Sequence, residues 1–199
     1  MAWVGIIVVA KALKLEKYGF ELKAYSLVYK NKSVNDVLIK VLGRTKRGIK
    51  VFADLSVIAG FLMMGFAFYF LLNNVSNYFV APDGFSELTV LIPGVTLTSA
   101  PAITYFLLSI PIVLVMHEGA HGIVAALEKI KIKTGGFAIF IALFAGFVEP
   151  DEEEFEKAKK ISKLRVIGAG ATSNVLFAIV LGAIMLTNPI FGMVLESIP

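Results

Sequence analysis

Three residues in the run His117-Glu118-Gly119-Ala120-His121 have the types and spacing of a zinc site. In a helix, His117 and His121 lie one turn apart on the same face, so their neutral imidazoles could hold one zinc ion. Glu118 lies about 100° around the helix, off the ligand axis, which suits a general base. Chance is the alternative, but ionisable groups are costly in an apolar helix and favour a functional role. We therefore predict that His117 and His121 bind Zn2+ and that Glu118 is catalytic.

The composition is typical of a polytopic membrane protein. Hydrophobic residues make up 57% of the 199 residues, charged residues only 17%, and the mean hydropathy is +0.80. All 19 Lys and Arg residues lie in two intervals, 11–50 and 129–165. Such clustering is typical of cytoplasmic loops beside a lipid bilayer, so we expect no nucleic-acid partner. The chain has no cysteine, which excludes disulfides and thiolate ligands.

Apolar stretches long enough to cross a bilayer occur at residues 51–72, 102–127 and 166–186. A shorter one, residues 2–10, could tilt into the membrane or lie at its interface. The basic intervals place residues 73–100 outside the cell. The helix with the histidines then runs inward and carries its metal site into the cytoplasmic half of the bilayer. We predict an integral, multi-pass membrane protein with three to four transmembrane helices.

Several shorter segments leave alternatives open. Residues 137–148 are too few for a comfortable span and predict either a β-hairpin or a short core helix. Residues 20–29 have strand-like composition, and residues 33–44 predict a short amphipathic helix. Acids at 151–154, followed by lysines, predict a solvated helix. Asn174, within the last apolar stretch, is either an interhelical hydrogen-bonding residue or a site residue.

Four motifs, in this order and spacing, resemble the site-2 protease family of intramembrane zinc metalloproteases, particularly its PDZ-containing branch. They are IPGVTLT at 92–98, HEGAHGI at 117–123, GGFAIFIALFAGFVEP at 135–150 and GAGATSN at 168–174. The resemblance implies that His117 and His121 bind zinc, that Glu118 activates water and that Asn174 is an accessory residue. It also implies a membrane-embedded β-hairpin at residues 137–148, near the substrate. The fold class is then an all-α polytopic membrane protein with a short embedded β-hairpin.

Members of this family cleave transmembrane segments of other proteins in regulated intramembrane proteolysis. Their third zinc ligand is an aspartate in a Leu-Asp-Gly motif on a later helix, and this sequence has no such motif. We therefore expect the third zinc ligand to be absent from this chain and to come from a downstream carboxyl-terminal half. The expected organisation is a short apolar segment with a basic region (1–50), half of the protease core (51–190) and the start of a PDZ domain (191–199).

Two other functions are compatible with the residues. One is a membrane zinc protease that uses a glutamate as its third ligand. Glu128 lies on the same helix as His121 but about 10 Å further along it, too far to share a metal ion. The other is a non-catalytic scaffold or transporter with a buried His/Glu cluster, which should purify without stoichiometric zinc.

Overall fold

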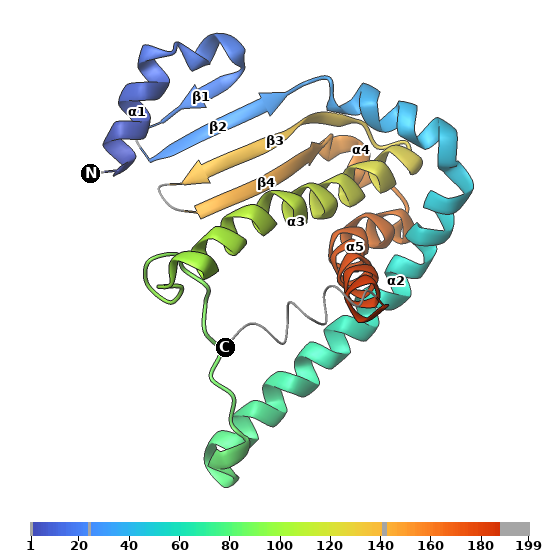
Figure 1. Ribbon diagram of the computed structural model, residues 1–199. Coiled ribbons are helices and arrows are strands. Elements are labelled where there is room, and N and C mark those ends of the chain that lie inside the picture. The colour runs from blue at the N-terminus through green and yellow to red at the C-terminus, as the bar shows by residue number, and fades with distance from the viewer. Residues whose placement is uncertain (1, 24, 141–142, 188–199) are drawn as a thin grey trace.

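The computed structural model describes residues 2–23, 25–140 and 143–187 (Figure 1). The described part is mostly helical, contains three helices long and apolar enough to cross a membrane, and has one small antiparallel sheet. Residues 191–199, expected to begin a PDZ domain, lie outside the described residues. In chain order the elements are α1 (Ala2–Ala12), η1 (Leu15–Tyr18), β1 (Phe20–Leu22), β2 (Ser26–Asn31), α2 (Val34–Val80), η2 (Pro82–Gly84), α3 (Ala100–Leu127), β3 (Ile132–Phe140), β4 (Leu143–Pro150), α4 (Glu152–Lys157) and α5 (Lys160–Thr187).

Helix α2 joins two segments that the sequence predicts as separate helices. It runs through 47 residues and departs from helical geometry only at Thr45, where φ is −134° and ψ is 26°. Gly43 and Gly48 flank this kink, and glycine is a weak helix former. The expected amphipathic helix and the expected span are therefore two arms of one kinked helix (Figure 1).

The loop after the first span is shorter than predicted, because α2 continues to Val80. The asparagines near its end hold the following segment instead of ending the helix. Asn74 donates to the carbonyl of Ser86 and accepts from the Ser86 amide, each at 2.8 Å. Asn77 donates to the carbonyl of Gly84 at 2.9 Å. These bonds satisfy loop groups that water would otherwise have to satisfy.

The four strands form a sheet in the order β1-β2-β3-β4, with antiparallel neighbours. The hairpin prediction is confirmed in type, although the strands are longer than residues 137–148. Strand β2 pairs with β3 from Ser26↔Phe140 to Asn31↔Gly135, so an early segment joins the hairpin in one sheet. No side chain fits at Gly136, where a Cβ atom would collide with the carbonyl of Tyr29. Helix α3 lies along β4, the strand at one edge of the sheet (Figure 1).

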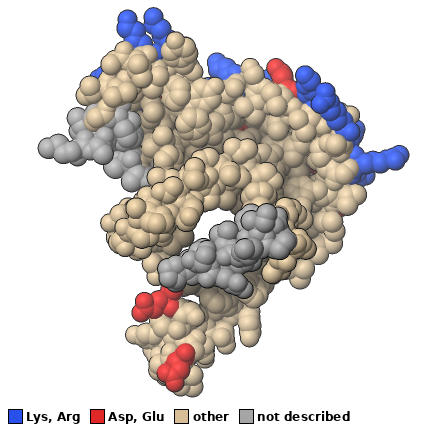
Figure 2. Space-filling model, in the orientation of Figure 1, with Lys and Arg blue, Asp and Glu red and all other residues tan. Residues whose placement is uncertain are grey.

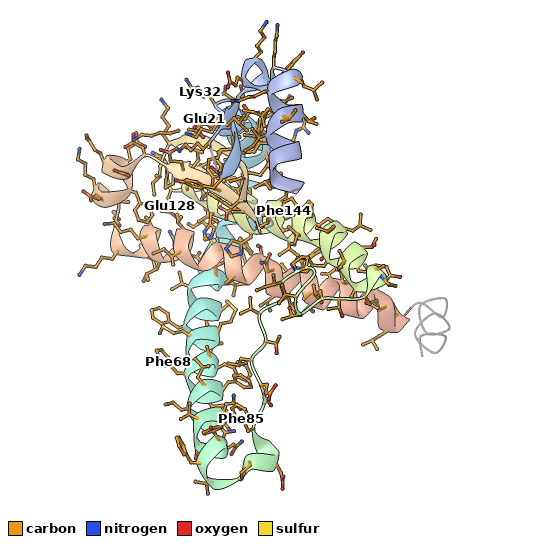
Figure 3. The ribbon with its side chains drawn as sticks, turned by 90° about the vertical axis from the view of Figure 1, so that its left-hand side faces the viewer. Glu21, Lys32, Phe68, Phe85, Glu128 and Phe144 are labelled. Atoms are coloured by element: carbon orange, nitrogen blue, oxygen red, sulfur yellow. The ribbon has the colours of Figure 1, made fainter. Side chains whose placement is uncertain are left out.

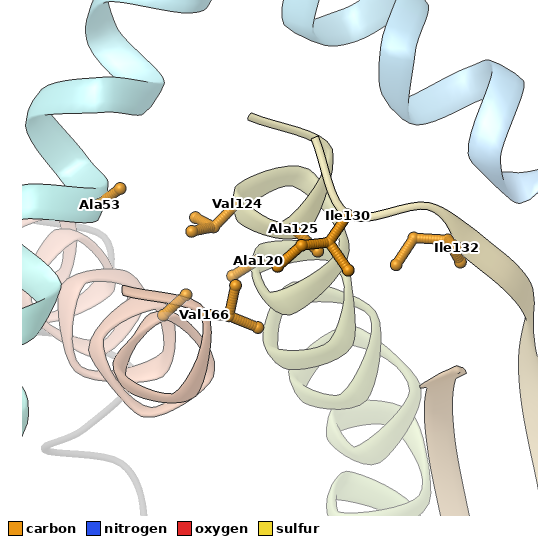
Figure 4. Close-up of a cluster of buried hydrophobic side chains, with 8 residues drawn as sticks. Ala53, Ala120, Val124, Ala125, Ile130, Ile132 and Val166 are labelled. Atoms are coloured by element: carbon orange, nitrogen blue, oxygen red, sulfur yellow. The ribbon is translucent and has the colours of Figure 1, made fainter. Parts of the chain in front are cut away.

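The described core lies where α2, α3 and α5 meet the start of β3 (Figure 4). Its buried side chains are mostly small: Ala53, Ala120, Val124, Ala125, Ile130, Ile132, Val166 and Ala169. Small residues allow helix backbones to approach closely, which is how apolar helices associate where no water is expelled. A Cβ atom on Gly168 would lie 2.5 Å from the carbonyl oxygen of Ser56, and one on Gly60 would lie 3.7 Å from the Gly168 Cα atom. Helices α2 and α5 therefore touch backbone to backbone.

The acidic run after β4 forms the start of α4, as predicted. Asp151 is the N-cap, and its carboxylate accepts from the backbone N–H of Glu154 at 3.0 Å. This bond holds the pKa of the Asp151 carboxyl below its ordinary value, helped by Lys133 at 3.3 Å. The acids at 151–154 are thus engaged in beginning a helix.

Charge is segregated along the molecule. Figure 2 shows lysine and arginine near the sheet and the first arm of α2. Near the distant end of α2, the only charged side chains visible are acidic. Phe68 and Phe85 lie near that distant end (Figure 3), and exposed apolar side chains cover most of the second arm of α2. This distribution fits a helix surrounded by lipid with basic residues at one membrane surface.

We expect the end of the molecule near Lys159 to be cytoplasmic and the end near Ser86 to be external, because of this charge distribution. Both residues are exposed, and the chain has no cysteine to give background. In intact cells, a membrane-impermeant maleimide should label Ser86→Cys, and should label Lys159→Cys only after the cells are permeabilised. The opposite pattern would reverse the orientation.

Candidate metal centre

Helix α3 holds the three motif residues in the predicted arrangement. Its N-cap is Ser99, whose side chain accepts from the Ala102 amide at 3.3 Å, and Pro101 lies in the first turn. The helix then continues through Pro111 to Leu127. The rings of His117 and His121 lie 4.8 Å apart, centre to centre. The helix thus brings the two imidazoles together on one face.

Both imidazoles point their Nε2 atoms at the same place on α5. A Cβ atom on Gly170 would lie 2.6 Å from Nε2 of His117, and closer still to Nε2 of His121. Gly170 is buried, and its lack of a side chain lets both ring nitrogens lie close against the α5 backbone. Two imidazoles whose Nε2 atoms converge in this way offer the kind of donor pair that binds one zinc ion.

The other ring nitrogens, Nδ1, are also engaged by α5. Nδ1 of His121 lies 2.6 Å from the carbonyl oxygen of Val166. Because a carbonyl only accepts, this contact places a proton on Nδ1 and leaves Nε2 with a free lone pair. Nδ1 of His117 lies 3.1 Å from Nδ2 of Asn174. The predicted site residues His117, His121 and Asn174 therefore lie together at the contact between α3 and α5.

Glu118 faces a different neighbour. A Cβ atom on Gly146, in β4, would lie 2.9 Å from Cγ of Glu118. Glu118 lines a cavity of about 480 Å³ between α3 and the sheet. The other walls of this cavity are mainly apolar side chains and glycines of α3, β3 and β4, among them Leu114, Phe137, Phe144 and Phe147. Figure 3 shows Phe144 between the sheet and α3. The carboxyl group thus borders space that could admit an apolar peptide segment.

Glu128, the glutamate weighed above as a third ligand, has other partners. Its carboxylate accepts from Ser162 and, at 2.8 Å, from Arg165. Arg165 also donates to Asp54 of α2, with Nε at 2.8 Å. This cluster joins α2, α3 and α5 at the end where basic residues gather. Among the described residues, no three His, Cys, Asp or Glu side chains lie close enough together to hold a metal ion.

Sequence reasoning found His117, Glu118, His121 and Asn174 but did not identify Gly170 and Gly146 as parts of the site. The signal for both glycines was present in the motifs GAGATSN and GGFAIFIALFAGFVEP. From the sequence, the first motif is interpreted as the segment that carries Asn174 and the second as a hairpin. Neither interpretation specifies which α3 side chain each glycine accommodates.

Gly170→Ala should weaken zinc binding, because the added methyl group would collide with both Nε2 atoms and displace the rings. We expect the zinc affinity to fall by more than the about 10–100-fold that loss of an outer hydrogen-bonding partner costs. The measurement is a zinc titration of purified protein in detergent. Gly182→Ala, also on α5, is the matched control, because an added Cβ atom at Gly182 would have no neighbouring atom within 4 Å. Unchanged zinc affinity in a folded Gly170→Ala protein would show that the metal ion does not depend on the positions of the two Nε2 atoms.

Comparison with protein-family models matches residues 105–195 to Peptidase family M50. No solved structure matches the chain. The matched range contains His117, Glu118, His121, Gly170 and Asn174, and members of the M50 family are zinc metalloproteases. Residues 105–195 of this chain therefore match the model of peptidase family M50, the site-2 protease family.

Proposed function

We propose that this chain forms an intramembrane zinc endopeptidase site that cleaves transmembrane segments of other proteins in regulated intramembrane proteolysis. The observation that carries the proposal is the convergence of two Nε2 atoms at Gly170, with Glu118 at the next helix position after His117. All three side chains stand on a helix apolar enough to cross a membrane. The match to a metallopeptidase family supports the reaction class.

The roles of the side chains follow from their neighbours. His117 and His121 would hold zinc, which when bound supplies a Lewis acid for the scissile carbonyl and lowers the pKa of water. Glu118 stands on the side of the apolar cavity, where its carboxylate accepts a proton and can return it to the leaving amine. A substrate segment held against the apolar walls of this cavity would exclude water, which would strengthen electrostatic interactions around the reacting peptide.

The sheet offers a way to hold an unwound substrate. A helical peptide has its carbonyls hydrogen-bonded along the helix, so a cleavable segment must be extended. Strand β4 ends the order β1-β2-β3-β4 and, among the described residues, pairs on one side only. It also contacts Glu118 through Gly146. An extended substrate segment in the cavity between β4 and α3 would thus lie beside the general base.

Membrane placement completes the proposal. Helices α2, α3 and α5 would span the bilayer as part of a multi-pass protein, and the hairpin would be embedded in it. The motif lies in the half of α3 nearer the basic intervals, which favours an active site in the cytoplasmic half of the bilayer. The proposed partners are therefore the lipid bilayer and a transmembrane protein substrate.

Glu118→Gln should abolish peptide hydrolysis and leave zinc bound, because it removes a base and no ligand. His117→Ala and His121→Ala should lose both zinc and hydrolysis. The assay is cleavage of a single-span substrate in proteoliposomes, with zinc content measured on the same preparations. Loss of zinc from Glu118→Gln would make the glutamate a ligand. A wild-type protein that purifies folded and cannot bind zinc would favour the scaffold or transporter function.

We also expect zinc to have too few ligands in this chain by itself, since catalytic zinc normally has three protein ligands plus water. The described residues offer two histidines. Glu128, the glutamate weighed above as a third ligand, is bound to Arg165 and Ser162. The 199-residue chain should therefore bind zinc weakly and turn over slowly. Adding a carboxyl-terminal half that carries a Leu-Asp-Gly motif should raise both. Tight stoichiometric zinc and full activity in the monomeric chain alone would contradict this expectation.

A further inference from the structure

Asn174 contacts His117 in a way that its role as a general accessory residue does not explain. It lies one turn after Gly170 on α5, and its Nδ2 atom is 3.1 Å from Nδ1 of His117. Its Oδ1 atom is buried and has no hydrogen-bond partner among the described residues. A buried amide oxygen without a partner is costly, so this side chain has an unused acceptor next to a proposed zinc ligand.

The protons define two states of this pair. A neutral imidazole carries one N–H. When Nδ2 of Asn174 donates to Nδ1 of His117, the proton of the ring is on Nε2, and Nε2 cannot bind a metal ion. When Nε2 holds a metal ion, Nδ1 carries the proton and requires an acceptor. Rotating the Asn174 amide by 180° exchanges Nδ2 for Oδ1 and supplies that acceptor in the same place.

We propose that Asn174 is a positioning residue whose side-chain amide rotates by half a turn when His117 binds metal. In the metal-free protein it donates to Nδ1 of His117, and in the loaded protein it accepts from Nδ1–H. His121 differs, because its Nδ1 faces the carbonyl of Val166, which accepts in both states. The two histidines are therefore unequal: His121 is fixed in the metal-binding tautomer, whereas His117 reaches it through Asn174.

A purely structural role is the alternative, and the neighbouring residue illustrates it. Ser173 is buried in the same contact between α3 and α5, but donates to the carbonyls of Met116 at 3.0 Å and Gly170 at 2.7 Å. It joins the helices without touching a histidine ring nitrogen. Ser173→Ala is thus a matched control for loss of a polar contact at this interface.

The inference rests on the metal-binding part of the proposed function, and it is tested by metal binding instead of proteolysis. We expect Asn174→Leu to lower the zinc affinity of the 199-residue chain by about 10–100-fold. Asn174→Asp keeps an acceptor and should bind zinc at least as tightly as the wild type, and Ser173→Ala should bind like the wild type. A structural role predicts the reverse order, because leucine suits an apolar interface and a buried carboxylate does not.

Two outcomes separate the proposals. If His117→Ala loses zinc but Asn174→Leu binds it like the wild type, the positioning role is wrong and the metal site stands. If His117→Ala itself keeps wild-type zinc affinity, the metal site is wrong.

A direct readout does not depend on variants. The chain has two histidines, so 15N-labelled histidine gives two sets of ring signals. At about pH 8, where both rings are ordinarily neutral, the metal-free protein should show His117 protonated on Nε2 and His121 on Nδ1. With zinc, both should be protonated on Nδ1. Two Nδ1–H histidines in the metal-free protein would overturn the amide rotation.

Discussion

The close contact between α3 and α5 at Gly170 determines the geometry of the proposed site. Helix periodicity places His117 and His121 on one face of α3, but it does not determine which element packs against that face. Gly170 lets the α5 backbone approach until both Nε2 atoms meet it. The same approach brings the carbonyl of Val166 and the amide of Asn174 within reach of the Nδ1 atoms. One helix contact therefore brings the two Nε2 atoms together and supplies the hydrogen bonds that orient both rings.

A charged cluster fixes the same helices nearer the basic end. Arg165 binds Asp54 of α2 and Glu128 at the end of α3, and Ser162 completes the partners of Glu128. Single charges in an apolar layer are costly, whereas a cluster in which each charge has a partner is tolerated. Arg165 directly precedes Val166, whose carbonyl holds His121. The cluster thus anchors the segment of α5 that orients one ligand.

The sequence was sufficient for the parts of the fold that depend on local pattern. The HEGAH spacing and the apolar run at residues 102–127 predicted α3 and the relative positions of its motif residues. The pairing of β2 with β3 could not be predicted, because it joins segments separated by the whole of α2 and α3 and leaves no local signal. The extent of α2 was also underestimated. Asn74 and Asn77 resemble loop residues in composition, but their side chains bind the backbone of the following segment.

Two glycines allow the histidines and Glu118 to contact different elements of the fold. Gly170 on α5 accommodates the histidines, and Gly146 on β4 accommodates Glu118, so α3 is closely packed on two sides. The rotation of about 100° between successive residues directs the ligands toward a helix and the base toward a sheet. The ring nitrogens of the histidines lie against the α5 backbone, whereas Glu118 borders an apolar cavity of about 480 Å³. In the proposed enzyme, the scissile peptide must therefore lie where this cavity adjoins the histidine face of α3, because the Lewis acid and the base act on the same bond.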